Sequence, residues 1–95
     1  NLIEEDSNFA EAWNKRATVY FMMGDFDKSM NDIIKTLELE PRHFGALDGM
    51  GLIFIHQGKY QQAIDVYDKM LEIFPYSIKT MEKKESIKLF ISQST

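Results

Sequence analysis

The sequence repeats itself with a period of 34 residues. Pro41 and Pro75 are separated by this spacing, and so are Gly24 and Gly58. Residues 10–43 align with residues 44–77 without a gap, and size and polarity are kept at most positions that are not identical. A fixed period of 20–50 residues is typical of proteins that stack one supersecondary unit many times. The chain is therefore expected to be an array of repeats.

Each repeat has the pattern of two helices. In the first repeat, Asn8 is a predicted N-cap with Glu11 three residues later, and apolar residues follow at helical spacing. Gly24 ends this helix and Asp25 can cap the next one. Pro41 closes the repeat, because the residue before a proline disfavours helix.

The second repeat follows the same plan. It predicts a helix over 44–57, a turn at Gly58, a helix over 60–73 and a stop at Pro75. A further helix is expected after Ser77 and is predicted to run to about Ile91. Residues 1–7 are interpreted as the remnant of a preceding helix or a tail, so that 1–95 is one domain with repeats at 10–43 and 44–77 and a capping helix at 78–91.

The residues at corresponding positions of the two copies resemble the pattern of the tetratricopeptide repeat, a 34-residue helix–turn–helix unit. The positions that carry the resemblance are Trp13, Ala17, Tyr20, Gly24, Ser29, Ile33 and Pro41, with Leu47, Gly51, Phe54, Gly58, Ala63, Tyr67 and Pro75 in the second copy. The resemblance implies an all-α fold, a right-handed superhelical stack of antiparallel helix pairs (an α-α superhelix). Arg16 and Met50 depart from it, since the family usually has Leu there.

Small residues at the helix contacts explain part of this pattern. Ala17 and Gly51 are expected to face Ser29 and Ala63 on the second helix of each repeat, so that the helices approach closely. A bulky residue at Ala17 would overpack that contact.

The helix after Ser77 breaks the register. Glu85 and Lys88 fall where a small residue and an aromatic residue would face a partner helix, so we expect this helix to be a solvating cap. Ile78, Ile87 and Ile91 are predicted to pack back on helix 60–73, and the other side would carry Lys83, Lys84, Glu85 and Lys88. The alternative is a broken third repeat that docks on something else.

Charge and composition exclude several classes of function. Residues 1–74 carry seven basic and thirteen acidic side chains (net −6), and residues 75–95 carry four lysines and two glutamates (net +2). This acidic balance argues against nucleic-acid binding. No apolar run is long enough for a membrane span, and there is no cysteine and no visible signal peptide, so a cytoplasmic location is favoured.

The sequence offers no catalytic grouping. His43 and His56 lie thirteen residues apart and do not form the i, i+4 pair of a helical zinc site. There is no Gly-rich phosphate loop and no nucleophile with a base. We therefore expect no enzyme, no metal and no cofactor.

The remaining candidate for function is a surface, because the first helices of stacked helical pairs line a concave groove. The predicted partner-binding residues are Asn14, Lys15, Thr18, Phe21, Met22, Asp48, Gly49, Leu52, Ile55, His56, Lys79 and Lys83, with Glu11, Gly45, Glu82 and Ser86 beside them. Leu52 and Ile55 fit either the groove or the core. Gly45 and Gly49 fit either close approach of a ligand backbone or tight packing.

Some members of the family bind a C-terminal peptide carboxylate through a two-carboxylate clamp, and its positions are only partly kept here. Asn14 stands in place of Lys, and Thr18 and Gly49 stand in place of Asn, whereas Lys79 and Lys83 match. A peptide with an apolar stretch and an acidic flank suits these residues better than a chaperone tail.

The sequence thus predicts a non-catalytic adaptor or scaffold that binds a protein, a peptide or a partner helix in its concave groove. The alternative is a structural element whose exposed apolar residues, such as Leu2, Ile3, Phe9 and Phe90, mediate homo-oligomerisation or packing on further repeats. Arrays of this kind usually need about three repeats. We therefore expect the natural protein to extend upstream, or this chain to self-associate.

Overall fold

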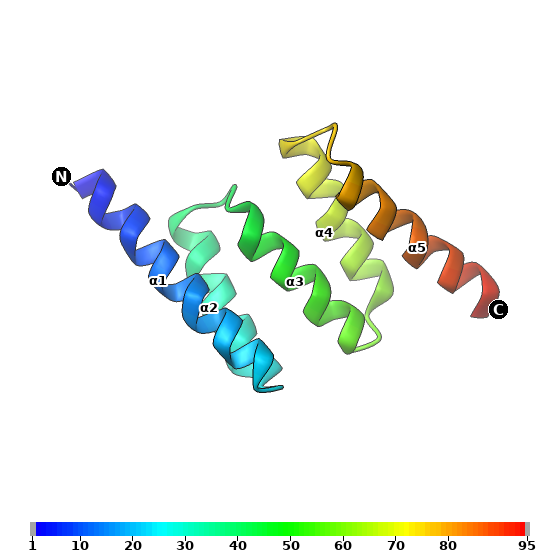
Figure 1. The fold of residues 1–95 in the computed structure, drawn as a ribbon, viewed down its shortest axis with the longest axis horizontal. Coiled ribbons are helices and arrows are strands. Elements are labelled where there is room, and N and C mark those ends of the chain that lie inside the picture. Colours follow the sequence, from blue (N-terminus) through cyan, green and yellow to red (C-terminus); the bar gives the residue numbers. More distant parts are fainter. Residues whose placement is uncertain (1, 95) are drawn as a thin grey trace. The chain divides into compact units, whose positions relative to one another are not determined.

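The computed structural model describes residues 2–94, and the side chains of residues 9–93 within that range. These residues form five α-helices and no strand (Figure 1). The helices are α1 (Leu2–Met22), α2 (Phe26–Leu39), α3 (Phe44–His56), α4 (Tyr60–Ile73) and α5 (Ile78–Ser94). The predicted all-α, helical-repeat fold class is confirmed.

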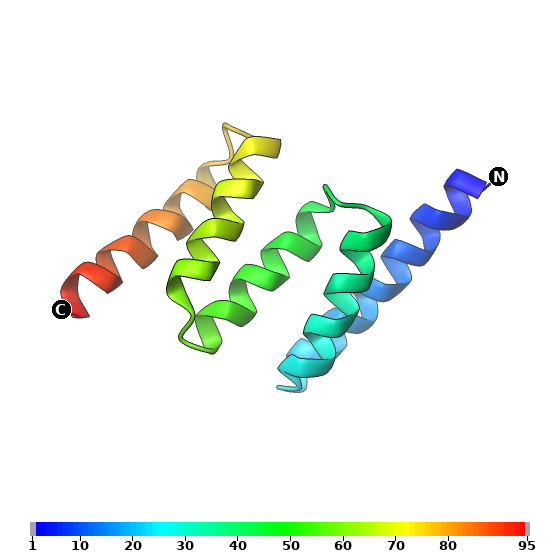
Figure 2. The ribbon, with the colours of Figure 1, turned by 180° about the vertical axis from the view of Figure 1, so that it is seen from behind.

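The chain divides into two compact units, Asn1–Gly49 (unit 1) and Met50–Thr95 (unit 2). In unit 1, α1 packs antiparallel against α2, and in unit 2, α4 packs antiparallel against α5, as both views show (Figures 1 and 2). Among the described residues, none of the helices combines the length and the apolarity that crossing a bilayer requires.

The prediction for the start of the first helix is wrong. The helix begins at Leu2, so Asn8 lies inside α1 and is not its N-cap, and residues 2–7 belong to α1 instead of a preceding helix or a tail. No Gly or Pro interrupts residues 1–8, and three acidic residues at Glu4–Asp6 favour the positive end of the helix dipole. The last helix also runs further than predicted, to Ser94.

The turn between α1 and α2 confirms the predicted stop and cap. Gly24 has a φ of +80°, a conformation that favours glycine, and the backbone N–H of Asp25 donates to the carbonyl of Tyr20 at 2.9 Å. The Asp25 side chain then accepts a hydrogen bond from the backbone N–H of Lys28 and caps α2. Gly58 forms the same turn between α3 and α4, with a φ of +74°.

The buried face of α2 in unit 1 is largely polar. Its buried residues are Ser29, Asp32, Ile33 and Thr36. The Ser29 hydroxyl donates to the carbonyl of Ala17 on α1 at 2.7 Å, which confirms the predicted close contact of these helices. The Thr36 hydroxyl donates to the carbonyl of Asp32 at 2.9 Å, so these buried polar groups have partners, as low-dielectric surroundings require.

The corresponding face of α4 in unit 2 is apolar. Ala63, Val66, Tyr67 and Met70 occupy the positions of Ser29, Asp32, Ile33 and Thr36, 34 residues later. All four side chains are buried. At these equivalent positions, unit 1 therefore has mainly hydrogen-bonded polar side chains and unit 2 has apolar side chains.

The residues of α5 that pack toward α4 match the prediction at Ile87, which is buried as expected, and depart from it at Ile78. Thr80 and Ile87 are buried, whereas Ile78 is 66% exposed. Lys84 was expected on the solvent side, but its Nζ lies 2.6 Å from a carboxylate oxygen of Asp68 on α4. Helical periodicity explains both corrections, because residues 80, 84, 87 and 91 share one stripe and residue 78 lies on the opposite side.

Candidate functional site

A cavity of about 360 Å³ opens in unit 2 (the larger chamber). Its walls come from the second half of α3 and from α5, and a residue of α4 contributes as well. The lining residues are Leu52, Ile55, Tyr67, Lys79, Glu82, Lys83, Ser86 and Ile87. Six residues named for the predicted groove therefore lie together, namely Leu52, Ile55, Lys79, Glu82, Lys83 and Ser86.

Leu52 and Ile55 lie on the wall of the larger chamber and are half-buried. The buried core residue of this helix is the neighbouring Ile53, whose side chain is inaccessible to solvent. Leu52 and Ile55 are therefore not fully buried in the core of unit 2.

Tyr67 and Ile87 line the larger chamber and were not predicted as site residues. Tyr67 is fully buried and its ring lies against Gly51 on α3. A Cβ at Gly51 would lie 2.8 Å from Cε1 of the ring, so only glycine leaves room for the tyrosine at this contact. The pairing of a glycine with a large aromatic residue 16 positions later was the available sequence signal.

A second cavity of about 230 Å³ adjoins the first one (the smaller chamber). Both chambers are lined by Ile55, Ser86 and Ile87, and the smaller chamber also by Tyr60 and Phe90. The rings of Tyr60 and Phe90 lie 5.0 Å apart at a tilted angle, a favourable aromatic geometry. The two chambers together are called the unit 2 groove below.

Charged side chains line only one end of the unit 2 groove. Lys79, Glu82 and Lys83 contribute to the larger chamber, and the smaller chamber has no charged lining residue. The groove therefore has charged residues at one end and aromatic residues at the other.

The predicted groove residues of α1 do not line the described cavities. The ring of Phe21 packs on Phe26 of α2, with centroids 5.3 Å apart. The Thr18 hydroxyl donates to the backbone carbonyl of Asn14 at 3.0 Å. Lys15 and Met22 are exposed.

The glycines at the start of α3 face side chains of unit 1. A Cβ at Gly49 would meet Cδ1 of Ile33 at 3.3 Å, and a Cβ at Gly45 would meet Cε1 of His43 at 3.3 Å. This geometry is that of packing within the unit. Asp48 is half-buried and His56 is exposed, and neither lines the described cavities.

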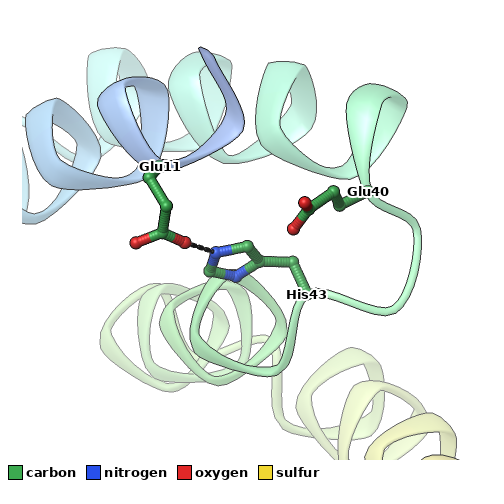
Figure 3. A group of neighbouring side chains, drawn as sticks. All are labelled: Glu11, Glu40 and His43. Atoms are coloured by element: carbon green, nitrogen blue, oxygen red, sulfur yellow. Dashed lines mark hydrogen bonds and ion pairs between the residues drawn. The ribbon is translucent and has the colours of Figure 1, made fainter. Parts of the chain in front are cut away.

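Glu11, Glu40 and His43 bring three potential metal ligands within 4.8 Å of one another in unit 1 (Figure 3). Nε2 of His43 hydrogen-bonds to Oε1 of Glu11 on α1. Nδ1 of the same ring accepts a hydrogen bond from the backbone N–H of Ala46 at 3.0 Å, and in this way His43 caps α3.

The hydrogen bonds of His43 fix its tautomer. Nδ1 accepts from a backbone N–H, so it carries no proton, and the proton of the neutral ring is on Nε2, where it is donated to Glu11. A protonated nitrogen has no lone pair for a metal ion. The contacts of His43 are therefore those of a helix cap that is also bonded to α1.

Family models of the tetratricopeptide repeat match residues 10–43 and residues 44–77. These are the same two ranges over which the sequence aligns with itself. The chain belongs to the tetratricopeptide repeat family.

Relatives with the same repeat occur in distant organisms. A TPR repeat-containing protein of Rhizobium etli is 47% identical over 68 residues, which are 72% of this chain and 33% of that protein. The DnaJ homolog subfamily C member 3 of Gallus gallus is 34% identical over 73 residues, 77% of this chain and 14% of that protein. The chain thus spans about a third or less of the length of these relatives.

Among solved structures, the first TPR domain of Spaghetti (RPAP3), bound to the HSP90 peptide SRMEEVD, has the same fold. The TM-score is 0.80, with 19% sequence identity over 88% of this chain and 68% of the other. At this identity the likeness concerns the tetratricopeptide fold alone.

Proposed function

We propose that the chain is a non-catalytic protein-interaction module, an adaptor or scaffold that binds a peptide or a partner helix in the unit 2 groove. One observation carries the proposal. Leu52 and Ile55 of α3 line a cavity of about 360 Å³ together with Lys79 and Lys83 of α5. Sequence positions far apart in the chain thus converge on one concave, accessible surface.

The chemistry of this surface suits a polypeptide ligand. Half-buried aliphatic side chains offer apolar area, and its removal from water contributes about 25 cal/mol per Å². The lysines at the rim favour acidic partners and raise the association rate more than the final affinity. The peptide complex of the structural neighbour supports the proposal, because a tetratricopeptide domain of similar fold binds a short peptide.

A peptide-array screen followed by Leu52→Glu tests the proposal. The new carboxylate would lie in the larger chamber, and we expect it to reduce binding of the selected peptides strongly. Leu89→Glu is the matched control, because Leu89 is exposed on α5 and lines neither chamber. Circular dichroism establishes that both variants are folded. Unchanged binding by a folded Leu52→Glu variant would remove the groove from the proposal.

A second candidate function is assembly with another copy or with further repeats. The turn between α4 and α5 favours it, because Phe74, Tyr76 and Ile78 expose more than half of their surface within five residues. Among the other interface residues expected from the sequence, Phe9 is exposed, Phe90 packs partly on Tyr60, and the side chains of Leu2 and Ile3 lie outside the described residues. Light scattering at several concentrations shows whether the chain is a dimer or a monomer. A dimer that does not bind peptides favours assembly, and a monomer that binds them favours the interaction module.

A further inference from the structure

The helices α1 and α5 each expose a stripe of side chains on the side turned away from the helix on which they pack. Resting on the second candidate function, assembly with another copy, we propose that the exposed stripe of α5 in one copy packs on the exposed stripe of α1 in the next copy. The contact is head-to-tail, because it joins two different surfaces of the same chain. A second copy of the chain is thus the occupant of both surfaces.

The exposed stripe of α1 lies within unit 1 and consists of Ala12, Lys15, Val19 and Met22. Spacings of three, four and three residues place these side chains on one side of the helix. The other side packs on α2 (Figures 1 and 2) and contains the buried Ala17. Val19 and Met22 expose more than half of their surface, so this side of α1 offers apolar area to a partner.

The exposed stripe of α5 lies within unit 2 and consists of Ile78, Glu82, Glu85 and Leu89. Its spacings are four, three and four residues, and the buried Ile87 lies on the side that packs on α4. Ile78 and Leu89 also expose more than half of their surface. This stripe therefore has an apolar residue at each end and two acidic residues between them.

The two stripes match in length and in spacing. Ten residue steps from Ala12 to Met22 span about 15 Å, and eleven steps from Ile78 to Leu89 span about 17 Å, at 1.5 Å per residue. Alternating spacings of three and four are those of helices whose side chains pack into each other along a seam. Each stripe carries its charge between apolar residues, so the apolar ends can be buried together while the charges meet.

The charges of the two stripes are opposite. The stripe of α1 carries the ammonium of Lys15, and the stripe of α5 carries the carboxylate of Glu82. Glu85 lies 3.7 Å from Lys88 on its own helix, so the attraction depends mainly on Lys15 and Glu82. Two copies of the α5 stripe would bring carboxylates together, and two copies of the α1 stripe would bring lysines together. Pairing of unlike stripes is therefore favoured over pairing of like stripes.

A contact between unlike stripes has a consequence for the size of the assembly. Each copy that joins still offers one unused stripe, so association continues beyond a dimer unless the copies close into a ring. A single pair of helix faces of about three turns is a small interface. We therefore expect the association to be weak and to increase with the concentration of the chain.

Sedimentation velocity over a wide range of concentrations tests the proposal. We expect Lys15→Glu and Glu82→Lys each to weaken the association about threefold to tenfold, because each change replaces an attraction by a repulsion. An equimolar mixture of the two variants is expected to recover the association of the natural chain. In that mixture, both the stripe pairs that join unlike variants have opposite charges again.

Matched controls make the same changes of charge outside the two stripes. Lys69→Glu and Glu72→Lys alter exposed residues of α4, and they are expected to leave the association unchanged apart from a small salt-dependent effect. Circular dichroism establishes that all four variants are folded.

The outcomes separate this inference from the other proposals. Association that neither charge reversal changes, but that Tyr76→Ser weakens, overturns the paired stripes and leaves assembly through the turn between α4 and α5. Losses in both single variants without recovery in their mixture also overturn the pairing. A chain that stays monomeric at every concentration overturns this inference together with the assembly candidate. The peptide groove is tested independently by Leu52→Glu.

Discussion

The guanidinium of Arg16 on α1 donates to both carboxylate oxygens of Asp32 on α2, from Nε at 2.7 Å and from Nη2 at 2.9 Å. One repeat later, these two positions hold Met50 and Val66. Both members of the pair thus change together, from an ion pair in unit 1 to apolar residues in unit 2. The hydrogen bonds that Arg16 donates to Asp32 are the main cause that raises the pKa of Arg16 above its ordinary value.

We expect unequal losses of stability when Arg16 and Asp32 are substituted one at a time. The Asp32 side chain is 4% exposed and that of Arg16 is 56% exposed. Arg16→Met leaves a buried carboxylate without a counter-ion, at a cost of about 3–5 kcal/mol for Asp32. Asp32→Val is expected to cost less, because the freed guanidinium reaches water and still lies over Trp13 and Tyr20.

Urea denaturation of both single variants and of Arg16→Met/Asp32→Val measures this coupling. The double variant recreates the pair of the second repeat, and we expect it to be at least as stable as the natural chain. Additive losses in the double variant would contradict the account of the ion pair.

Gly51→Ala is expected to destabilise unit 2 by about 1–3 kcal/mol, because the new Cβ overlaps the Tyr67 ring. The gain in helix propensity offsets about 1 kcal/mol of the loss. Adding Tyr67→Ile recreates the Ala17 and Ile33 pair of the first repeat and should restore stability. Gly49→Ala is the control: its new Cβ meets only the flexible end of Ile33, and we expect no net loss in the thermal midpoint.

His43→Ala is expected to lower stability by about 0.5–2 kcal/mol, because α3 loses its N-cap. His43→Ser should recover most of this loss, since Ser77 has the corresponding position and accepts a hydrogen bond from the backbone N–H of Thr80 at 3.4 Å. Thermal denaturation compares the three chains. A rise of the midpoint with zinc that is lost in His43→Ser would contradict the tautomer assigned to His43.

Peptides selected for binding to this chain are expected to bind equally well with a free and with an amidated C-terminus. Asn14, Thr18 and Gly49 stand where the family's clamp has Lys and Asn, so the charge-assisted donors for a terminal carboxylate are missing. Isothermal titration with the two forms checks this. A strong preference for the free acid would show that other donors replace the clamp.

Lys84 gives unit 2 a pH-dependent contribution to stability. Hydrogen bonding to Asp68 is the main cause that raises the pKa of Lys84 above its usual 10.5. The ammonium is thus favoured in the folded state. The stabilisation by this ammonium is fully present below the pKa that Lys84 has in the unfolded chain. It is lost as the pH rises through the pKa that Lys84 has in the folded chain.

The unfolding midpoints of the natural chain and of Lys84→Met measure that contribution. We expect them to differ at pH 8 and to converge above the pKa of Lys84. Lys79→Met, which alters a lysine outside this pair, should show no such convergence. A constant difference across the pH range would assign the effect to packing of the lysine stem.

The repeats, turns and helix order could be predicted because they depend on local rules. Gly24, Asp25 and Pro41 act within one or two helical turns of their own position. The polar interface of unit 1 could not be predicted in the same way. Asp32 stands in an apolar pattern, and only the packing of α1 on α2 brings Arg16 opposite to it.

Only some of the residues that line the unit 2 groove could be predicted from the sequence. Leu52, Ile55, Lys79 and Lys83 follow from the register of the first helices, which a 34-residue period fixes. Tyr67 lines the groove because Gly51 leaves space for its ring. Ile87 was expected to pack on the helix over 60–73, and it lines the groove as well. Such details depend on pairs of side chains from separate helices.

The contrast between the polar face of α2 and the apolar face of α4 also disfavours incorrect pairing between helices of the two similar repeats. If α3 were to dock on α2 in the manner of α1, Met50 would lie opposite the carboxylate of Asp32. The exchanged arrangement would bury a charge that has no counter-ion, and folding would be driven away from it. The two repeats therefore differ at positions where an exchange of their helices would bury an unpaired charge.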